Sequence, residues 1–123
     1  MHRIALGLAV LLAAAIIGIG LQYLLAPRAA TRSFGLPLPE DGANTTWWLR
    51  LKGVRDITSG LVVLATMVWV SPQVAGLILL IDTLIPLGDM CTILAARGSR
   101  ARAFGIHGVT AAVMLIAAVP LLT

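Results

Sequence analysis

The chain has 123 residues, of which 59% are hydrophobic and 11% are charged, and its formal net charge is +4. Soluble domains are about 45–50% apolar and about 25% charged, so this composition excludes an ordinary soluble domain. On so apolar a chain the basic excess fits anionic lipid headgroups, so we expect the lipid bilayer as a partner and no nucleic acid. The single cysteine, Cys91, excludes an internal disulfide and a thiolate metal cluster.

Four hydrophobic runs follow one another along the chain, each within the range of about 17–25 residues that a transmembrane helix needs. No strand-like alternation accompanies them. The sequence therefore predicts an all-α fold, a four-helix transmembrane bundle that forms a single domain over residues 1–123. The predicted helices cover about 4–26, 47–70, 74–96 and 103–122. The first run is longer than the apolar core of a cleaved signal, so we expect it to be a retained helix.

The loop predicted over about 27–46 is the largest segment outside the bilayer. Its prolines and glycines argue against regular structure, and one of the polar residues 44–46 could cap the next helix. Trp47 and Trp48 then stand where an aromatic belt at the membrane interface belongs.

The basic residues predict the orientation of the bundle. Four crossings place both termini and the short turn at 71–73 on one side, together with Arg3 alone, and the other eight basic residues on the opposite side. The positive-inside rule then predicts cytoplasmic first and third loops, with both termini outside. We expect the plasma (inner) membrane of a bacterium as the location.

Each predicted helix carries a polar side chain at one depth, in the cytoplasmic third of the membrane. Helical rise places His107 about 8 Å inside the membrane from the start of its helix near Arg102, and it places Asp56, Asp89, Gln22 and Tyr23 at a similar depth. This coincidence predicts a polar site inside the bundle.

Asp56 belongs to a stripe of small residues on the second helix. Gly53, Asp56 and Gly60 share one face, and small residues mark faces that pack against other helices. We therefore expect Asp56 to point inward, with Arg55 or His107 as its partner. The alternative is a simple interfacial pair, in which the Arg55 side chain extends to the headgroups.

The third helix carries two carboxylates seven residues apart on one face. Asp82 lies near mid-membrane, where ionisable residues are functional hypotheses by default, and Asp89 follows it. Pro86 lies between them and removes the hydrogen bond that the carbonyl of Asp82 would accept. We expect Thr83 or ordered water to satisfy this carbonyl.

His107 carries the side chain best suited to exchange protons near neutral pH, although a buried hydrogen-bonding role is the simpler alternative. Two aspartates and a histidine could also hold a divalent ion. Their spacing matches no metal motif, and no cofactor motif is present, so we expect neither a metal nor a cofactor.

Lys52-Gly53-Val54-Arg55-Asp56 followed by Gly60, together with Asp82 and His107, resembles small DoxX-like four-helix membrane proteins. More narrowly, it resembles a domain-of-unknown-function family in which Gly-x-Arg-Asp-x-x-x-Gly opens the second helix. Phe34-Gly35-Leu36-Pro37 in the first loop also fits. This resemblance implies a four-helix bundle and no particular chemistry.

Three hypotheses for function follow. The first is an intramembrane pocket that binds a lipophilic small molecule, and that could transform it by acid/base isomerisation, cyclisation or epoxide opening. Asp56, Asp82, Asp89 and His107 would be its catalytic residues, and its substrate-binding residues would be Arg55, Gln22, Tyr23, Trp47 and Trp48. The second is a non-catalytic membrane subunit of an oxidoreductase complex. The third is a proton-coupled exporter that works as a homodimer.

Overall fold

The computed structural model describes all residues of the chain, and its only regular secondary structure is helical, with no strand. This confirms the all-α prediction. The helices are α1 (His2–Leu25), α2 (Pro27–Thr31), α3 (Ala43–Trp69), α4 (Pro72–Asp82), α5 (Leu84–Ala95), α6 (Arg100–Arg102), the π-helical segment η1 (Ala103–Gly108) and α7 (Val109–Leu122).

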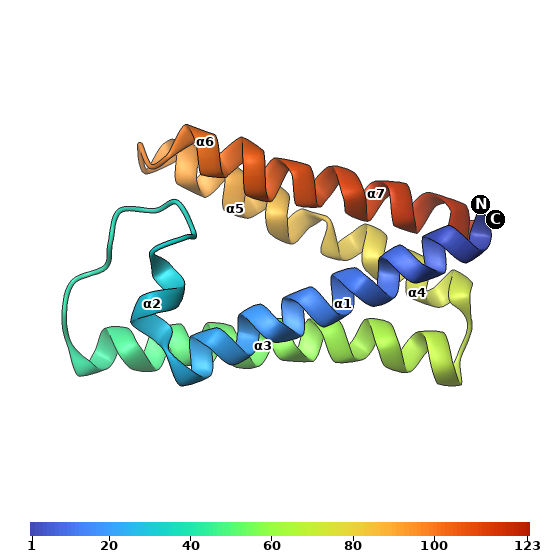
Figure 1. Cartoon of the computed structure of the whole chain (residues 1–123), viewed down its shortest axis with the longest axis horizontal. Coiled ribbons are helices and arrows are strands. Elements are labelled where there is room, and N and C mark those ends of the chain that lie inside the picture. The colour runs from blue at the N-terminus through green and yellow to red at the C-terminus, as the bar shows by residue number, and fades with distance from the viewer.

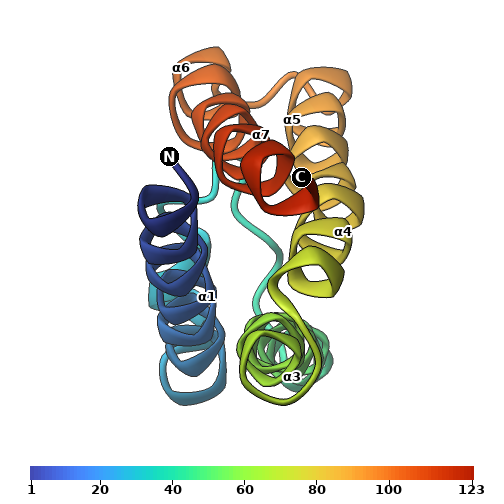
Figure 2. The ribbon, with the colours of Figure 1, turned by 90° about the vertical axis from the view of Figure 1, so that its right-hand side faces the viewer.

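The helices form two pairs that meet at one end of the molecule and separate toward the other. Figure 1 shows α1 lying along α3, and α4 and α5 lying along η1 and α7. Both chain termini lie where the pairs meet, which we call the terminal end. At the opposite end, the loop end, α2 and residues 32–42 bridge the two pairs. Figure 2, viewed from the terminal end, shows α1 beside α3 and α7 beside α4.

The core of the terminal end is built from small residues. Ala5, Ala9 and Ala13 of α1 are buried in one cluster with Ala117 and Leu121 of α7. Alanine side chains let helix backbones approach closely, which is how helices associate within lipid. The two pairs are therefore held together at this end.

Three glycines hold α1 against α3. A Cβ atom added at Gly53 would lie 2.6 Å from the carbonyl oxygen of Gly20, and one added at Gly60 would lie 2.6 Å from that of Ala13. No side chain fits at such distances. The predicted inward stripe of Gly53, Asp56 and Gly60 is confirmed, because all three residues are buried against α1 or the interior.

The predicted third helix is interrupted at Thr83, where α4 ends and α5 begins. The break lies just before Pro86, which lacks the N–H that would continue the hydrogen-bond ladder. The Thr83 hydroxyl donates to the carbonyl of Leu79 at 3.0 Å. Of the two expected partners for the carbonyl of Asp82, the Thr83 hydroxyl is therefore excluded, and ordered water stays a prediction.

Two predictions about the first loop are also wrong. The loop contains the short helix α2, which Pro27 starts at a position where a missing N–H costs nothing. The next helix begins at Ala43 after Gly42, earlier than predicted, and no side chain caps it. Residues 44–46 thus lie in its first turn, where the Thr46 hydroxyl donates to the carbonyl of Gly42.

Three helical stretches are long and apolar enough to cross a membrane: His2–Leu25, Pro72–Ala95 and Arg100–Leu122. Large apolar side chains such as Leu11, Leu84 and Ile116 are exposed on their outer faces, as lipid-facing residues are. The chain is therefore a membrane protein by its helices. The fourth predicted crossing corresponds to α3, which is 27 residues long but carries four charged residues in its first half.

Candidate functional site

A cavity of about 250 Å³ lies between the two helix pairs, lined by α1, α3, α4, α5, η1, α7 and the first loop. We call it the central cavity. One part of its wall is apolar and includes Leu12, Ile16, Val63, Leu79 and Met114. The other part is polar, and its side chains come from α1, the first loop, α3, α4, α5, η1 and α7: Gln22, Tyr23, Ser33, Lys52, Ser59, Asp82, Asp89, His107 and Thr110.

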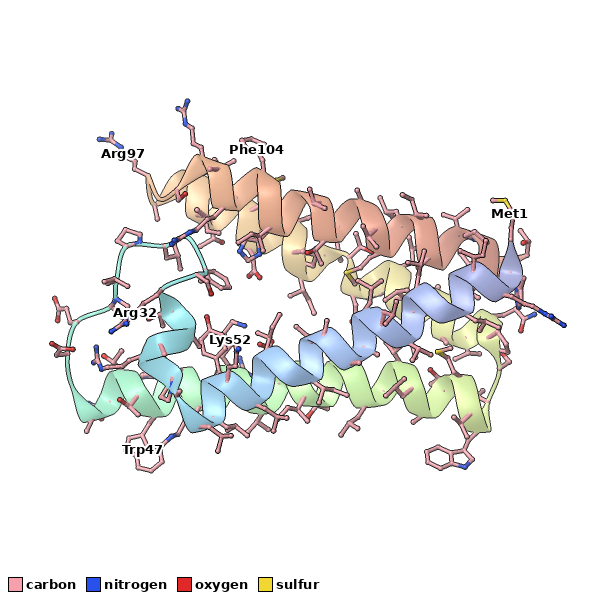
Figure 3. All side chains as sticks on the ribbon, viewed as in Figure 1. Met1, Arg32, Trp47, Lys52, Arg97 and Phe104 are labelled. Carbon is pink, nitrogen blue, oxygen red and sulfur yellow. The ribbon has the colours of Figure 1, made fainter.

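Lys52 is the cation of the polar wall. Its Nζ atom lies 2.5 Å from Oδ2 of Asp56, one helical turn along α3. The same ammonium group lies 4.4 Å from the centre of the Tyr23 ring and 5.4 Å from that of Phe34. Figure 3 shows Lys52 extending from α3 toward the space between the two pairs. Aromatic faces and a carboxylate together stabilise an ammonium group away from water.

Arg55 is therefore not the partner of Asp56 in this structure. Arg55 is exposed, whereas the buried Asp56 pairs with Lys52. Residues four apart share a helix face, and adjacent residues do not. The spacing of Lys52 and Asp56 is the sequence signal that could have identified this pair.

His107 connects the last helix to the first loop and to α5. Its Nε2 atom lies 2.9 Å from the carbonyl oxygen of Phe34, and its Nδ1 atom lies 3.5 Å from Oδ2 of Asp89. A carbonyl oxygen only accepts hydrogen bonds, so Nε2 carries a hydrogen. Nδ1 faces the Asp89 carboxylate at an ion-pair distance. The His107 ring therefore connects the carbonyl of the first loop to an acidic side chain of α5.

Asp82 lies deeper, on the same wall of the cavity. Its Oδ2 atom accepts a hydrogen bond of 2.8 Å from the Ser59 hydroxyl of α3. No basic side chain pairs with it, in contrast to Asp56 and Asp89. The hydrogen bond links α4 to α3 at the cavity wall.

Two irregular segments of the backbone position the His107 ring and the Phe34 carbonyl. His107 belongs to the π-helical segment, where one extra residue per turn changes the direction of the side chains, and it is buried. The Phe34 carbonyl is positioned by the next residue, Gly35, whose φ of 113° suits glycine. The Gly35 carbonyl accepts a 2.8 Å hydrogen bond from the N–H of Ser99, which ties the loop to the second helix pair.

A second cavity, the side cavity, adjoins the first at the loop end. Its nine lining residues include Trp48, Arg55 and Asp56, and it shares Lys52 and Asp89 with the central cavity. It lies where α3 and α5 face each other without an extensive contact. The side cavity therefore lies beside the central cavity, between α3 and α5.

The structure brings most of the predicted site residues to these two cavities. Gln22, Tyr23, Asp82, Asp89 and His107 line the central cavity, and Arg55, Asp56 and Trp48 line the side cavity. Trp47 lines neither. It is exposed, and the guanidinium of Arg50 lies 5.0 Å from the centre of its ring.

Sequence reasoning missed Lys52, Ser59 and Phe34. The sequence analysis counts Lys52 only among the basic residues that orient the bundle and in the family motif. Ser59 has no signal beyond its place three residues after Asp56, on the same face of the helix. Phe34 is brought to the site by the loop, which no helical periodicity describes. The structure contains no group of three histidine, cysteine or acidic side chains placed to hold a metal ion.

Comparison with known families gives one match. The model of a family described as a domain of unknown function (DUF4267) matches residues 13–121, which is most of the chain. The chain therefore belongs to this family. No curated protein and no solved structure matches it. The resemblance to DoxX-like proteins stays a prediction.

Proposed function

We propose that this member of the DUF4267 family is a four-helix transmembrane bundle that binds a lipophilic small molecule in its central cavity and transforms it by acid/base chemistry. The observation that carries the proposal is the composition of one cavity wall. An apolar surface and the polar groups Lys52, Asp82, Asp89 and His107 face the same space of about 250 Å³. Ligand pockets combine an apolar lining with a few convergent polar groups.

The proposal takes α3 as the fourth crossing. The charged residues of α3 allow it to cross the bilayer, because Lys52 and Asp56 neutralise each other inside the bundle. Arg50 and Arg55 lie near the loop end, where arginine side chains reach the headgroups. With most basic residues at the loop end, the positive-inside rule orients this end toward the cytoplasm of a bacterial cell and the termini outside.

Access from the bilayer fits a lipophilic ligand. The side cavity lies between α3 and α5, which have no extensive contact, and Ile85 of α5 lines both cavities. Ile85 is 46% exposed, so it stands at the boundary between the cavities and the outer face. A molecule dissolved in lipid would pass this residue to reach His107.

Asp89 and His107 would carry the proton transfer. In one direction the imidazolium passes its Nδ1 proton to the Asp89 carboxylate, which lines the cavity and gives the proton to a basic atom of the substrate, leaving the ring neutral. In the other direction neutral Nδ1 accepts a proton, while the Phe34 carbonyl holds the ring in place through Nε2. Isomerisation, cyclisation and epoxide opening fit, because none of them needs a redox cofactor.

The proposal is tested by what copurifies with the protein. We expect organic extracts of the chain, purified in a mild nonionic detergent, to contain a lipophilic molecule by mass spectrometry. Ile85→Trp, which fills the opening to both cavities, should deplete this molecule at least tenfold. Leu84→Trp is the matched control, since Leu84 is 68% exposed and lines neither cavity. Equal recovery from both variants would contradict the proposal.

A further inference from the structure

We infer that the ligand of the central cavity carries a positively charged head, a protonated amine or a quaternary ammonium group. The inference rests on the proposed lipophilic pocket and names the chemical class that it takes. It follows from the balance of charges on the cavity wall, which holds two carboxylates, Asp82 and Asp89, and one lysine.

The lysine is not available to balance these two carboxylates. Lys52 lies 2.5 Å from Asp56, a third carboxylate that is buried to 8% exposure outside the central cavity. Asp89 has the imidazole of His107 at 3.5 Å and can share a proton with it. Asp82 has neither a lysine, an arginine nor a histidine within ion-pair distance, and only the Ser59 hydroxyl donates to it.

The position of Asp82 makes this lack of a partner costly. Asp82 lies near the middle of the Pro72–Ala95 span, far from the headgroups at either end. A carboxylate at the centre of a bilayer costs about 2.5–3.5 kcal/mol on insertion scales, and it is stabilised there by a partner of opposite charge. A cationic head beside Asp82 would be that partner.

The other head classes fit less well. An anionic head would meet two carboxylates and a lysine that is already paired, so repulsion would oppose its binding. A neutral head would leave Asp82 without a cation. The rings of Tyr23 and Phe34 already face the ammonium of Lys52, so the carboxylate is the main recognition element for a second cation. Leu79, Val63 and Met114 supply the apolar wall for the hydrocarbon part.

Three probes with the same chain length separate charge from hydrophobicity. We would measure saturable binding of radiolabelled dodecylamine, dodecanol and dodecanoate to the full chain in nanodiscs of zwitterionic phosphatidylcholine at pH 8, with empty nanodiscs subtracted. Dodecylamine should bind at least tenfold more tightly than dodecanol, and dodecanoate should bind most weakly. Equal affinity for amine and alcohol, or preference for dodecanoate, would overturn the charge assignment and leave the pocket itself standing. Absence of saturable binding by all three would overturn the proposed function as well.

Variants locate the effect. Asp82→Asn should lower the affinity for dodecylamine at least tenfold with little change for dodecanol, and Asp82→Glu should restore the preference. Asp41→Asn is the control, because this carboxylate is exposed in the first loop and pairs with Arg28. Unchanged amine binding by Asp82→Asn would refute the role of Asp82. If the Asp82→Asn protein does not fold, the ranking of the three probes on the unmodified chain still decides the charge class.

Discussion

The two ends of the bundle are built on opposite principles. At the terminal end, Ala5, Ala9 and Ala117 let the helix pairs touch, and the interior there is apolar and closely packed. From the middle of the molecule toward the loop end, the pairs separate around polar side chains. The helical pattern is interrupted at Thr83 and becomes π-helical over Ala103–Gly108, and the first loop fills part of the gap. The comparison teaches that the packed end holds the fold while the open end is free to carry ionisable groups. Four changes would test this division.

The largest effect is expected at Asp89 and His107 of the open end, the groups proposed to transfer the proton. Asp89→Asn and His107→Gln should each lower turnover of the molecule recovered from the pure protein by about 10²–10⁴-fold, the usual contribution of a positioned acid or base. Helical circular dichroism should be unchanged, since neither residue belongs to the apolar core. Thr110→Val offers a comparison, because the Thr110 hydroxyl lines the same cavity but already donates to the carbonyl of Ile106. Full turnover by either Asp89→Asn or His107→Gln would show that the substituted residue is not a catalytic acid or base.

The next effect concerns the lysine that neutralises Asp56. Lys52→Met should lower the free energy of unfolding by about 3 kcal/mol, because it leaves a buried carboxylate without a partner. We choose the lower end of the usual range because the Lys52 side chain is 32% exposed. The double variant Lys52→Met/Asp56→Leu should recover most of the loss, measured by circular dichroism in mixed micelles. A double variant no more stable than the single one would show that the ion pair is not what Lys52 supplies.

A smaller effect is expected at the contact between α1 and α3. Gly60→Ala should cost about 1–3 kcal/mol of unfolding free energy, since its new methyl group would lie 2.6 Å from the carbonyl oxygen of Ala13. Gly18→Ala is the matched control on α1, where a Cβ atom meets nothing within 4 Å. The same unfolding experiment serves both variants. Equal unfolding free energies for the two variants would mean that α1 and α3 can move apart at Gly60 without loss of stability.

The smallest effect is a gain in stability at the loop end. Arg97 follows α5 with a φ of 54°, in the left-handed region that glycine occupies more easily. The N–H groups of Arg97 and Gly98 bond the carbonyls of Leu94 and Ile93, which is the usual glycine-terminated helix end. Arg97→Gly should therefore raise the unfolding free energy by about 0.5–1 kcal/mol. A loss of stability would indicate that the exposed guanidinium of Arg97 contributes more than the backbone strain costs.

The helices were predictable from the sequence because their cause is local. Long apolar runs and the small-residue stripe at Gly53, Asp56 and Gly60 identified the helical segments and the inward face of α3. The break at Thr83 was only partly predictable. Pro86 predicts that one backbone hydrogen bond of the helix is missing, but it does not predict the residue at which regular helical hydrogen bonding begins again. The short helix α2 was missed because glycines and prolines later in the loop outweighed Pro27 at its start.

The site was less predictable, because it depends on distances between segments. Depth along each helix brought Asp89 and His107 to one level, and the structure places them 3.5 Å apart. Depth could not show which of two neighbouring basic residues turns toward Asp56, although the four-residue spacing of Lys52 favours it. The contribution of Phe34 comes from a loop conformation fixed by Gly35 and Ser99, which no periodicity encodes.

The π-helical turn at Ala103–Gly108 predicts what a deletion of one residue in this segment would do. The hydrogen bonds of a π-helical turn join residues five apart instead of four, so this turn contains one residue more than an α-helical turn. In a regular α-helix each residue adds a rotation of about 100°. Deleting a single codon within this segment would allow a continuous α-helix, and the residues before the deletion would then rotate relative to α7. His107 would lose its register with either Asp89 or the Phe34 carbonyl. Relatives that lack this one residue should therefore have lost the histidine contact while keeping the helix.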